Sequence, residues 1–193
     1  MIARFLNQRA AARRDISAGE KLFNTAPLTI TGVRGLNDNA ALGKPAAISG
    51  TCTTCHDAPN VGHHSLPLPL DIGVGHTGMA SLESDAAISA GLDELDQPNL
   101  PVFQISGCAS PFNNGEPVSF YTTDPGKALI SGLCSDVNRL KGPVLRALAA
   151  RAPYFHNGAA ATLLQAVNFY NQRFEMKLTE QQKAQLVSFL NSL

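Results

Sequence analysis

Apolar residues recur at helical spacing near the end of the chain. Four of them fall on one helical face: Leu186, Phe189, Leu190 and Leu193. This period is typical of an amphipathic helix whose apolar face packs on a core. Thr179 and Gln182 precede the apolar positions with the spacing of a capping box, in which each side chain accepts from the other residue's backbone N–H. We therefore predict a helix over residues 180–193.

Three further segments have helical patterns. Residues 163–174 follow Thr162, which can serve as an N-cap. Residues 144–150 follow Pro143, and proline is favoured at the start of a helix. Residues 1–23 contain few helix-breaking residues and are also predicted to be helical. The chain is therefore expected to be mostly α-helical.

A second capping-box spacing occurs inside the N-terminal segment. The Ser17 hydroxyl can accept from an early N–H, and Glu20 can reach back to Ser17. Residues 24–50 are rich in Gly, Pro, Asn and Thr. We expect a long loop there, with at most a short strand at residues 28–31.

The middle of the chain is rich in turn residues. Residues 57–80 contain too many Pro and Gly residues to sustain a helix for more than two turns. Residues 102–105 and 118–122 have strand character and flank the turn signal Asn114-Gly115, which predicts a hairpin. Asp124, followed by proline, is expected to cap a helix.

Composition excludes several classes of protein. Hydrophobic residues make up 44% of the 193 residues, 16 Gly and 12 Pro favour long loops, and the formal net charge is zero. A nucleic-acid-binding protein would show a basic stripe, which is absent. No apolar run approaches the roughly 20 residues of a transmembrane helix. Residues 83–96 hold five acidic residues and no basic ones, and we interpret them as a solvated surface.

The most informative motif is Cys52-Thr53-Thr54-Cys55-His56. This pattern is typical of c-type haem attachment: one turn separates the two sulfurs by about the distance between the two vinyl-derived carbons, and His56 can supply an iron ligand. A zinc site would need two more ligands at short spacing. A thioredoxin-like redox pair would need a βαβ context. We therefore expect one covalently attached haem c, with Cys52 and Cys55 as attachment residues and His56 as a metal ligand.

Two blocks of the sequence resemble known haem proteins. Residues 17–24, the haem motif and the C-terminal helix follow the order of class I cytochrome c domains. Three segments are more specific: Ala152-Pro153-Tyr154-Phe155-His156-Asn157-Gly158, the Leu140 to Arg146 segment before it, and the helix that ends Asn168-Phe169-Tyr170. Together they resemble the C-terminal haem domain of di-haem bacterial cytochrome c peroxidases and of their relative, the methylamine dehydrogenase-maturing enzyme. The likeness covers roughly residues 17–75 and 120–193.

The resemblance implies a class I cytochrome c-like domain over residues 1–193, with an insertion at about residues 76–122. The di-haem enzymes carry two Cys-x-x-Cys-His sites and a bridging Trp, whereas this chain has one such site and no Trp. The chain is therefore expected to be either a monohaem relative or the C-terminal part of a longer di-haem parent.

The resemblance also bears on the distal iron ligand. In that family the distal ligand lies fourteen residues after the His of the F-H-x-G motif, and it is Met in the peroxidases and Tyr in the maturation enzyme. From His156 this offset falls on Tyr170, and a phenolate ligand would favour ferric iron. Tyr170 could equally be an ordinary core residue. Met79 in a Gly-rich loop and His64 are alternative ligands.

The sequence leaves the roles of one histidine and two arginines open. His156 could hydrogen-bond a haem propionate or shape the distal side, or it could be a structural turn residue. Arg146 or Arg151 could pair with a propionate, or could be solvated. Cys108 and Cys134 are expected to form a disulfide, because haem attachment already places the chain in an oxidising compartment. The alternative is two buried thiols.

These features favour an electron-transfer domain that exchanges electrons with a redox partner protein. The alternative is a haem peroxidase-type oxidoreductase that acts on hydrogen peroxide or on a protein partner, which needs an open iron position and groups that move protons. No signal peptide precedes the motif: Met1 leads into an Arg-rich stretch without an apolar h-region. Since haem is attached outside the cytoplasm, we expect a periplasmic location, with the leader removed or upstream.

Overall fold

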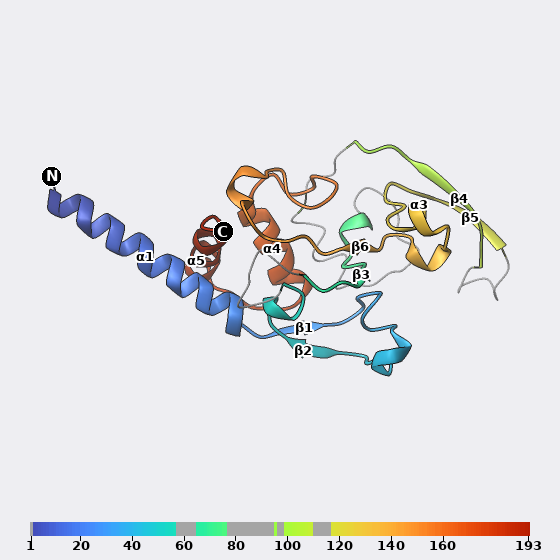
Figure 1. Ribbon diagram of the computed structural model, residues 1–193, viewed down its shortest axis with the longest axis horizontal. Coiled ribbons are helices and arrows are strands. Elements are labelled where there is room, and N and C mark those ends of the chain that lie inside the picture. Colours follow the sequence, from blue (N-terminus) through green and yellow to red (C-terminus); the bar gives the residue numbers. More distant parts are fainter. Residues whose placement is uncertain (1, 57–64, 77–94, 96–98, 110–116) are drawn as a thin grey trace.

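The computed structural model describes residues 2–56, 65–76, 95, 99–109 and 117–193. Three long helices dominate it: α1 (Ile2–Thr25), α4 (Leu163–Arg173) and α5 (Glu180–Leu190). The C-terminal half of α1 lies beside α5, and its N-terminal half extends away from the body of the molecule (Figure 1). Within the described ranges, no helix has the length and apolar character that a membrane crossing needs.

Among the described residues, the strands form three separate antiparallel pairs. These are β1 (Leu28–Ile30) with β2 (Ile48–Gly50), β3 (Pro69–Leu70) with β6 (Leu140–Lys141), and β4 (Phe103–Ala109) with β5 (Pro117–Thr122). The third pair confirms the predicted hairpin, with a register shift between Ile105 and Cys108. The fold is therefore helix-rich with small two-stranded sheets, as expected for a mostly α class.

In the part of the chain that the structure describes, the remaining regular elements are single turns. One is the short helix α3 (Ala128–Ser131); the others are the 3-10 helices η1 (Ala40–Leu42), η2 (Cys52–Thr54), η3 (Val74–His76), η4 (Cys134–Asp136) and η5 (Leu148–Ala150). Much of the described polypeptide between α1 and α4 is thus irregular. This agrees with its Gly and Pro content.

Helices α1 and α5 cross at a glycine. A Cβ on Gly19 would lie 2.0 Å from the Gln185 carbonyl oxygen and 2.7 Å from Phe189 Cβ. The rings of Phe23 and Phe189 meet one turn further on, with centroids 5.5 Å apart. Only a residue without a side chain allows the two backbones to approach this closely.

Local capping signals predicted the two C-terminal helices correctly. Thr162 and Gln165 bond each other's backbone N–H at the start of α4, and Thr179 and Gln182 do so at the start of α5. The prediction at Ser17 was wrong, because α1 runs uninterrupted through this position to Thr25.

Two other helix predictions were also wrong. Residues 144–150 form only the 3-10 turn Leu148–Ala150, because Ala147 adopts a left-handed conformation with φ 56°. Asp124 does not cap a helix, since α3 begins at Ala128 and Lys127 occupies its N-cap position. Its Oδ1 instead accepts from the Gly126 N–H in a buried turn.

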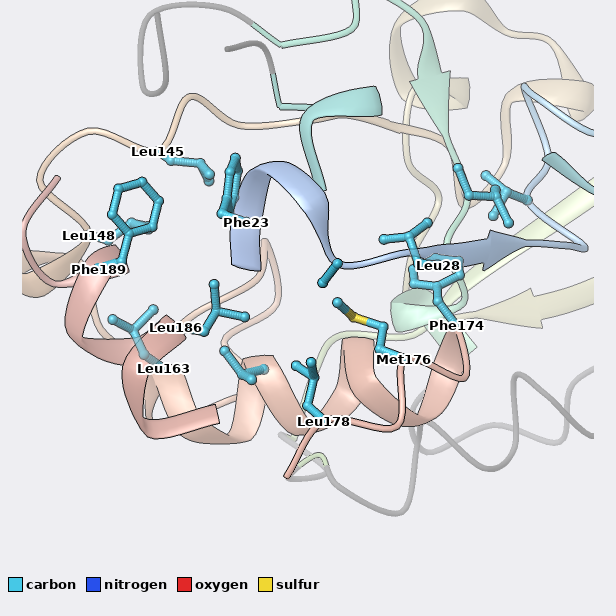
Figure 2. Close-up of a cluster of buried hydrophobic side chains, with 14 of the residues drawn as sticks. Phe23, Leu28, Leu145, Leu148, Leu163, Phe174, Met176, Leu178, Leu186 and Phe189 are labelled. Atoms are coloured by element: carbon cyan, nitrogen blue, oxygen red, sulfur yellow. The ribbon is translucent and has the colours of Figure 1, made fainter. Parts of the chain in front are cut away.

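The core gathers where α1 ends. Figure 2 shows side chains from α1, β1, α4, α5 and the segment around Leu145 facing a common interior. Phe23, Phe174 and Phe189 are the phenylalanine rings of this cluster, and all three are almost completely buried. Disulfide Cys108–Cys134 confirms the predicted pairing and connects β4 to η4.

Candidate functional site

A cavity of about 390 Å³ opens within this core. Its size lies in the range of about 300–1,000 Å³ that is usual for small-molecule and cofactor sites. The lining is mainly apolar and includes Phe23, Leu28, Val33, Leu70, Leu145 and Phe174. Many of the labelled side chains in Figure 2 line it. A cavity of this size and lining suits a mainly apolar ligand.

The residues of the Cys-x-x-Cys-His motif lie on the wall of this cavity. Cys52 begins η2, and its carbonyl oxygen accepts from the backbone N–H of Cys55 at 3.3 Å and of His56 at 3.0 Å. This single turn brings both sulfurs and the imidazole to the same cavity. Both thiols are free.

Burial keeps these three groups uncharged. It raises the pKa of the Cys52 thiol to about 11 and also raises the pKa of Cys55. It lowers the pKa of His56 to about 4, an effect that the nearby Pro143 backbone opposes. Near neutral pH the site therefore presents two S–H groups and a neutral imidazole, which is the form that binds metals.

The site has the properties of a haem-attachment site. Nδ1 of His56 is buried and has no hydrogen-bond partner of good geometry among the described residues. Two protonated thiols and a neutral imidazole line a mainly apolar cavity. In the described part of the chain, no three His, Cys, Asp or Glu side chains converge as a metal-binding group. The residues present thus fit a c-type haem better than a zinc ion.

Tyr170 lines the same cavity as His56. It projects from α4 and stacks on Phe174, with ring centroids 5.9 Å apart, and it also contacts Phe155 and Phe169. Burial raises the pKa of the phenol above its usual range, and the nearby thiols of Cys55 and Cys52 add to this shift. The structure therefore brings together the two residues that the sequence suggested as axial ligands.

His156 also reaches this cavity. Its Nε2 lies 2.8 Å from Oδ2 of Asp124, whose side chain is only 6% exposed. Asp124 in turn lies against Gly75, where a Cβ would come within 2.3 Å of the same oxygen. The neighbouring Phe155 contacts the Tyr170 ring, so the His156 loop forms the wall beside Tyr170.

Two basic residues line the cavity, and one of them is an arginine that the sequence suggested. Arg146 is exposed and does not line the cavity, whereas Arg151 does. Lys141 lines it as well, and sequence reasoning did not select it. Lys141 lies in the Leu140 to Arg146 segment, in strand β6, which pairs with β3.

The other suggested ligands lie outside the described residues. Met79 and His64 belong to the segments 77–94 and 57–64, and the side chain of His76 is likewise not described. Iron ligation by Met79 or by His64 therefore stays a prediction.

Two curated proteins show sequence similarity to the chain. The cytochrome-c peroxidase IdrP2 of Denitromonas iodatirespirans is 32% identical over 152 residues, which cover 75% of this chain and 36% of that protein. The cytochrome c551 peroxidase of Nitrosomonas europaea is 33% identical over 116 residues, which cover 52% of this chain and 34% of that protein. No protein-family model matches the chain. No solved structure matches it significantly.

The similarity identifies the chain as cytochrome c peroxidase-like in sequence over the matched residues. The matched residues amount to about a third of the length of either relative.

Proposed function

We propose that the chain is a c-type cytochrome domain that carries one covalently attached haem and transfers electrons. The observation that carries this proposal is the placement of two protonated thiols, a neutral imidazole and Tyr170 on one apolar cavity. The similarity to two cytochrome c peroxidases supports haem c as the cofactor.

Each residue of the motif would have a different role in holding the haem. Cys52 and Cys55 would each add their S–H across one vinyl group, so that the sulfur forms a thioether bond and the proton goes to the neighbouring carbon. His56 would supply an imidazole nitrogen to the iron, and the apolar lining would exclude water. The bound haem supplies a centre that accepts and donates one electron.

Attachment can be tested with Cys52→Ala and Cys55→Ala. After expression with a haem-attachment system, we expect the wild-type chain to retain an acid-stable chromophore and the double variant to lose it. Cys108→Ala with Cys134→Ala is the matched control, since it removes two cysteines remote from the motif and should keep the chromophore. Acid-stable colour in the Cys52/Cys55 double variant would reject the proposal.

Tyr170 is proposed as the distal ligand. Its position on the cavity of His56 supports this role, and the phenol would lose its proton on binding ferric iron, whose positive charge opposes the effect of burial. Tyr170→Phe should then change the ferric absorption spectrum and spin state. Tyr154→Phe is the matched control, because Tyr154 lines the same cavity but donates its hydroxyl to the Leu148 carbonyl oxygen at 2.9 Å. Unchanged ferric spectra in Tyr170→Phe would exclude ligation.

A peroxidase-type activity is the second candidate. It is favoured by the similarity to two cytochrome c peroxidases, each of which is about three times as long as the matched region. Ferric electron paramagnetic resonance with and without hydrogen peroxide separates the two functions. A low-spin signal that peroxide leaves unchanged indicates two filled axial positions and an electron carrier. A high-spin or peroxide-responsive signal indicates an open position and an enzyme.

Location and partner follow from the same proposal. Covalent haem attachment and the Cys108–Cys134 disulfide both favour an oxidising compartment, so a periplasmic location is proposed. The partner would be a redox protein that contacts the haem edge. The formal net charge of zero does not favour either an acidic or a basic partner surface.

A further inference from the structure

Two cations occupy the rim of the cavity. Lys141 and Arg151 both line the cavity and both are exposed at the surface. A residue that faces both the cavity and the solvent lies at the mouth. Both positive charges are therefore placed where a ligand in the cavity would emerge into water.

Neither cation is neutralised by a carboxylate within the described residues. Four other basic side chains do have acidic partners: Arg34 with Asp71, Lys127 with Asp136, Arg139 with Asp38 and Lys183 with Glu180. Lys141 instead donates to the Ser65 hydroxyl at 3.2 Å. Unpaired cations at the mouth of an apolar cavity favour a ligand that has an apolar body and an anionic edge.

Arg151 is held in place by one nitrogen. Its Nη1 donates to the carbonyl oxygens of Val144 at 2.9 Å and Arg146 at 3.0 Å. Within the described residues, the donors on Nε and Nη2 have no recorded partner. A guanidinium presents five donors in a rigid fork, so one edge can be fixed by the backbone while another binds a carboxylate.

We propose that Arg151 and Lys141 bind the two propionate carboxylates of a haem in this cavity, and that Arg146 does not. This inference rests on the proposed function. It assigns two cations at the mouth to the two carboxylates that a haem carries on one edge, and it orients the opposite, vinyl-bearing edge toward the interior.

Removal of either positive charge should favour ferric haem, whose iron carries one more positive charge than ferrous haem. We expect Arg151→Gln and Lys141→Gln each to shift the ferric-to-ferrous ratio at a given potential about threefold toward ferric. That is a fall in midpoint potential of about 30 mV, since a tenfold change corresponds to 59 mV for one electron. Arg146→Gln is the matched control and should leave the potential unchanged.

The measurement is spectroelectrochemical titration of the haem-loaded chain, together with resonance Raman spectra of the propionate bending modes. The Raman modes should shift in Arg151→Gln and stay unshifted in Arg146→Gln, and Arg151→Lys should restore most of the potential. A purely structural role of Arg151 would leave the propionate modes in place.

Three outcomes would overturn the inference. Wild-type potentials in both Gln variants would overturn it while leaving covalent attachment intact. An equal or larger shift in Arg146→Gln would assign the propionate to Arg146 instead. A wild-type chain without covalent haem would overturn the proposed function and this inference together, and the acid-stable chromophore of the wild-type chain distinguishes that case from the first two.

Discussion

Oδ2 of Asp124 lies 2.8 Å from Nε2 of His156 and joins two loops that are far apart in the sequence. Asp124 follows β5, the second strand of the hairpin whose first strand, β4, is joined to η4 by the disulfide. His156 lies before α4. The same carboxylate fixes its own turn through the Gly126 N–H at 3.1 Å. The pair thus ties the hairpin region to the cavity wall beside Tyr170.

Asp124→Ala should destabilise the protein more than most surface substitutions. The substitution removes the buried carboxylate that accepts from the Gly126 N–H and lies beside the His156 imidazole. Loss of such a buried partner lowers the free energy of unfolding by on the order of 1–3 kcal/mol. Chemical denaturation of the haem-loaded chain measures the effect. Glu180→Ala is the control, because the Glu180–Lys183 pair is at the surface and such pairs contribute only about 0–1 kcal/mol. Equal losses in the two variants would argue against a structural role for Asp124.

Gly19→Ala should weaken the crossing of α1 and α5. Alanine raises intrinsic helix propensity by about 1 kcal/mol, but its methyl group would lie 2.0 Å from the Gln185 carbonyl oxygen. We expect a net loss on the order of 1–3 kcal/mol from overpacking. Thermal unfolding compares this variant with Lys21→Ala, an exposed site on the same helix that should show little change. A stabilised Gly19→Ala protein would mean that the helices separate readily.

Replacement of Cys108 and Cys134 by serine should lower stability by about 3 kcal/mol. The disulfide closes a loop over a sequence separation of 26, and loop closure restricts the unfolded chain more strongly than the folded one. Denaturant midpoints with and without a reductant give the same comparison in the wild-type chain. Cys108 is buried, so a midpoint that neither treatment lowers would contradict this expectation.

Asp136 should contribute to stability above pH 4 and lose that contribution in acid. A hydrogen bond from Ser131, followed by the charge of Lys127 at 3.1 Å, holds the pKa of Asp136 below its usual value in the folded protein. A carboxylate with a depressed folded pKa stabilises above its unfolded pKa, near 4, and stops doing so as the pH falls through the folded pKa. Stability measured from pH 6 to pH 2 should therefore fall less steeply in Asp136→Asn than in the wild type. Parallel curves would assign the acid limb to other groups.

Local signals were sufficient for part of the fold. The Thr162 and Thr179 caps each depend on residues within one turn, and both were predicted correctly. The hairpin followed from alternation and turn residues close in sequence. The same local signal failed at Ser17, because the tertiary contact of Gly19 with α5 favours an uninterrupted helix there.

Local sequence signals likewise account for only part of the candidate site. Spacing alone identified the Cys52, Cys55 and His56 set, since one turn brings the three side chains together. It could not choose between Arg146 and Arg151, which differ in whether they reach the cavity. That difference arises because Ala147 takes a left-handed conformation and ends the predicted helix.

The sequence by itself determined the chemistry available to this protein: a Cys-x-x-Cys-His motif, a phenol fourteen residues after His156, and capped C-terminal helices. Only the tertiary structure decided that Tyr170 and His56 share one apolar cavity, that His156 meets Asp124, and that Lys141 and Arg151 lie at the mouth. The physical reason is the separation along the chain over which each kind of interaction acts. Caps and attachment motifs act within a turn or two, whereas a cavity forms where side chains from distant segments pack together and leave space between them.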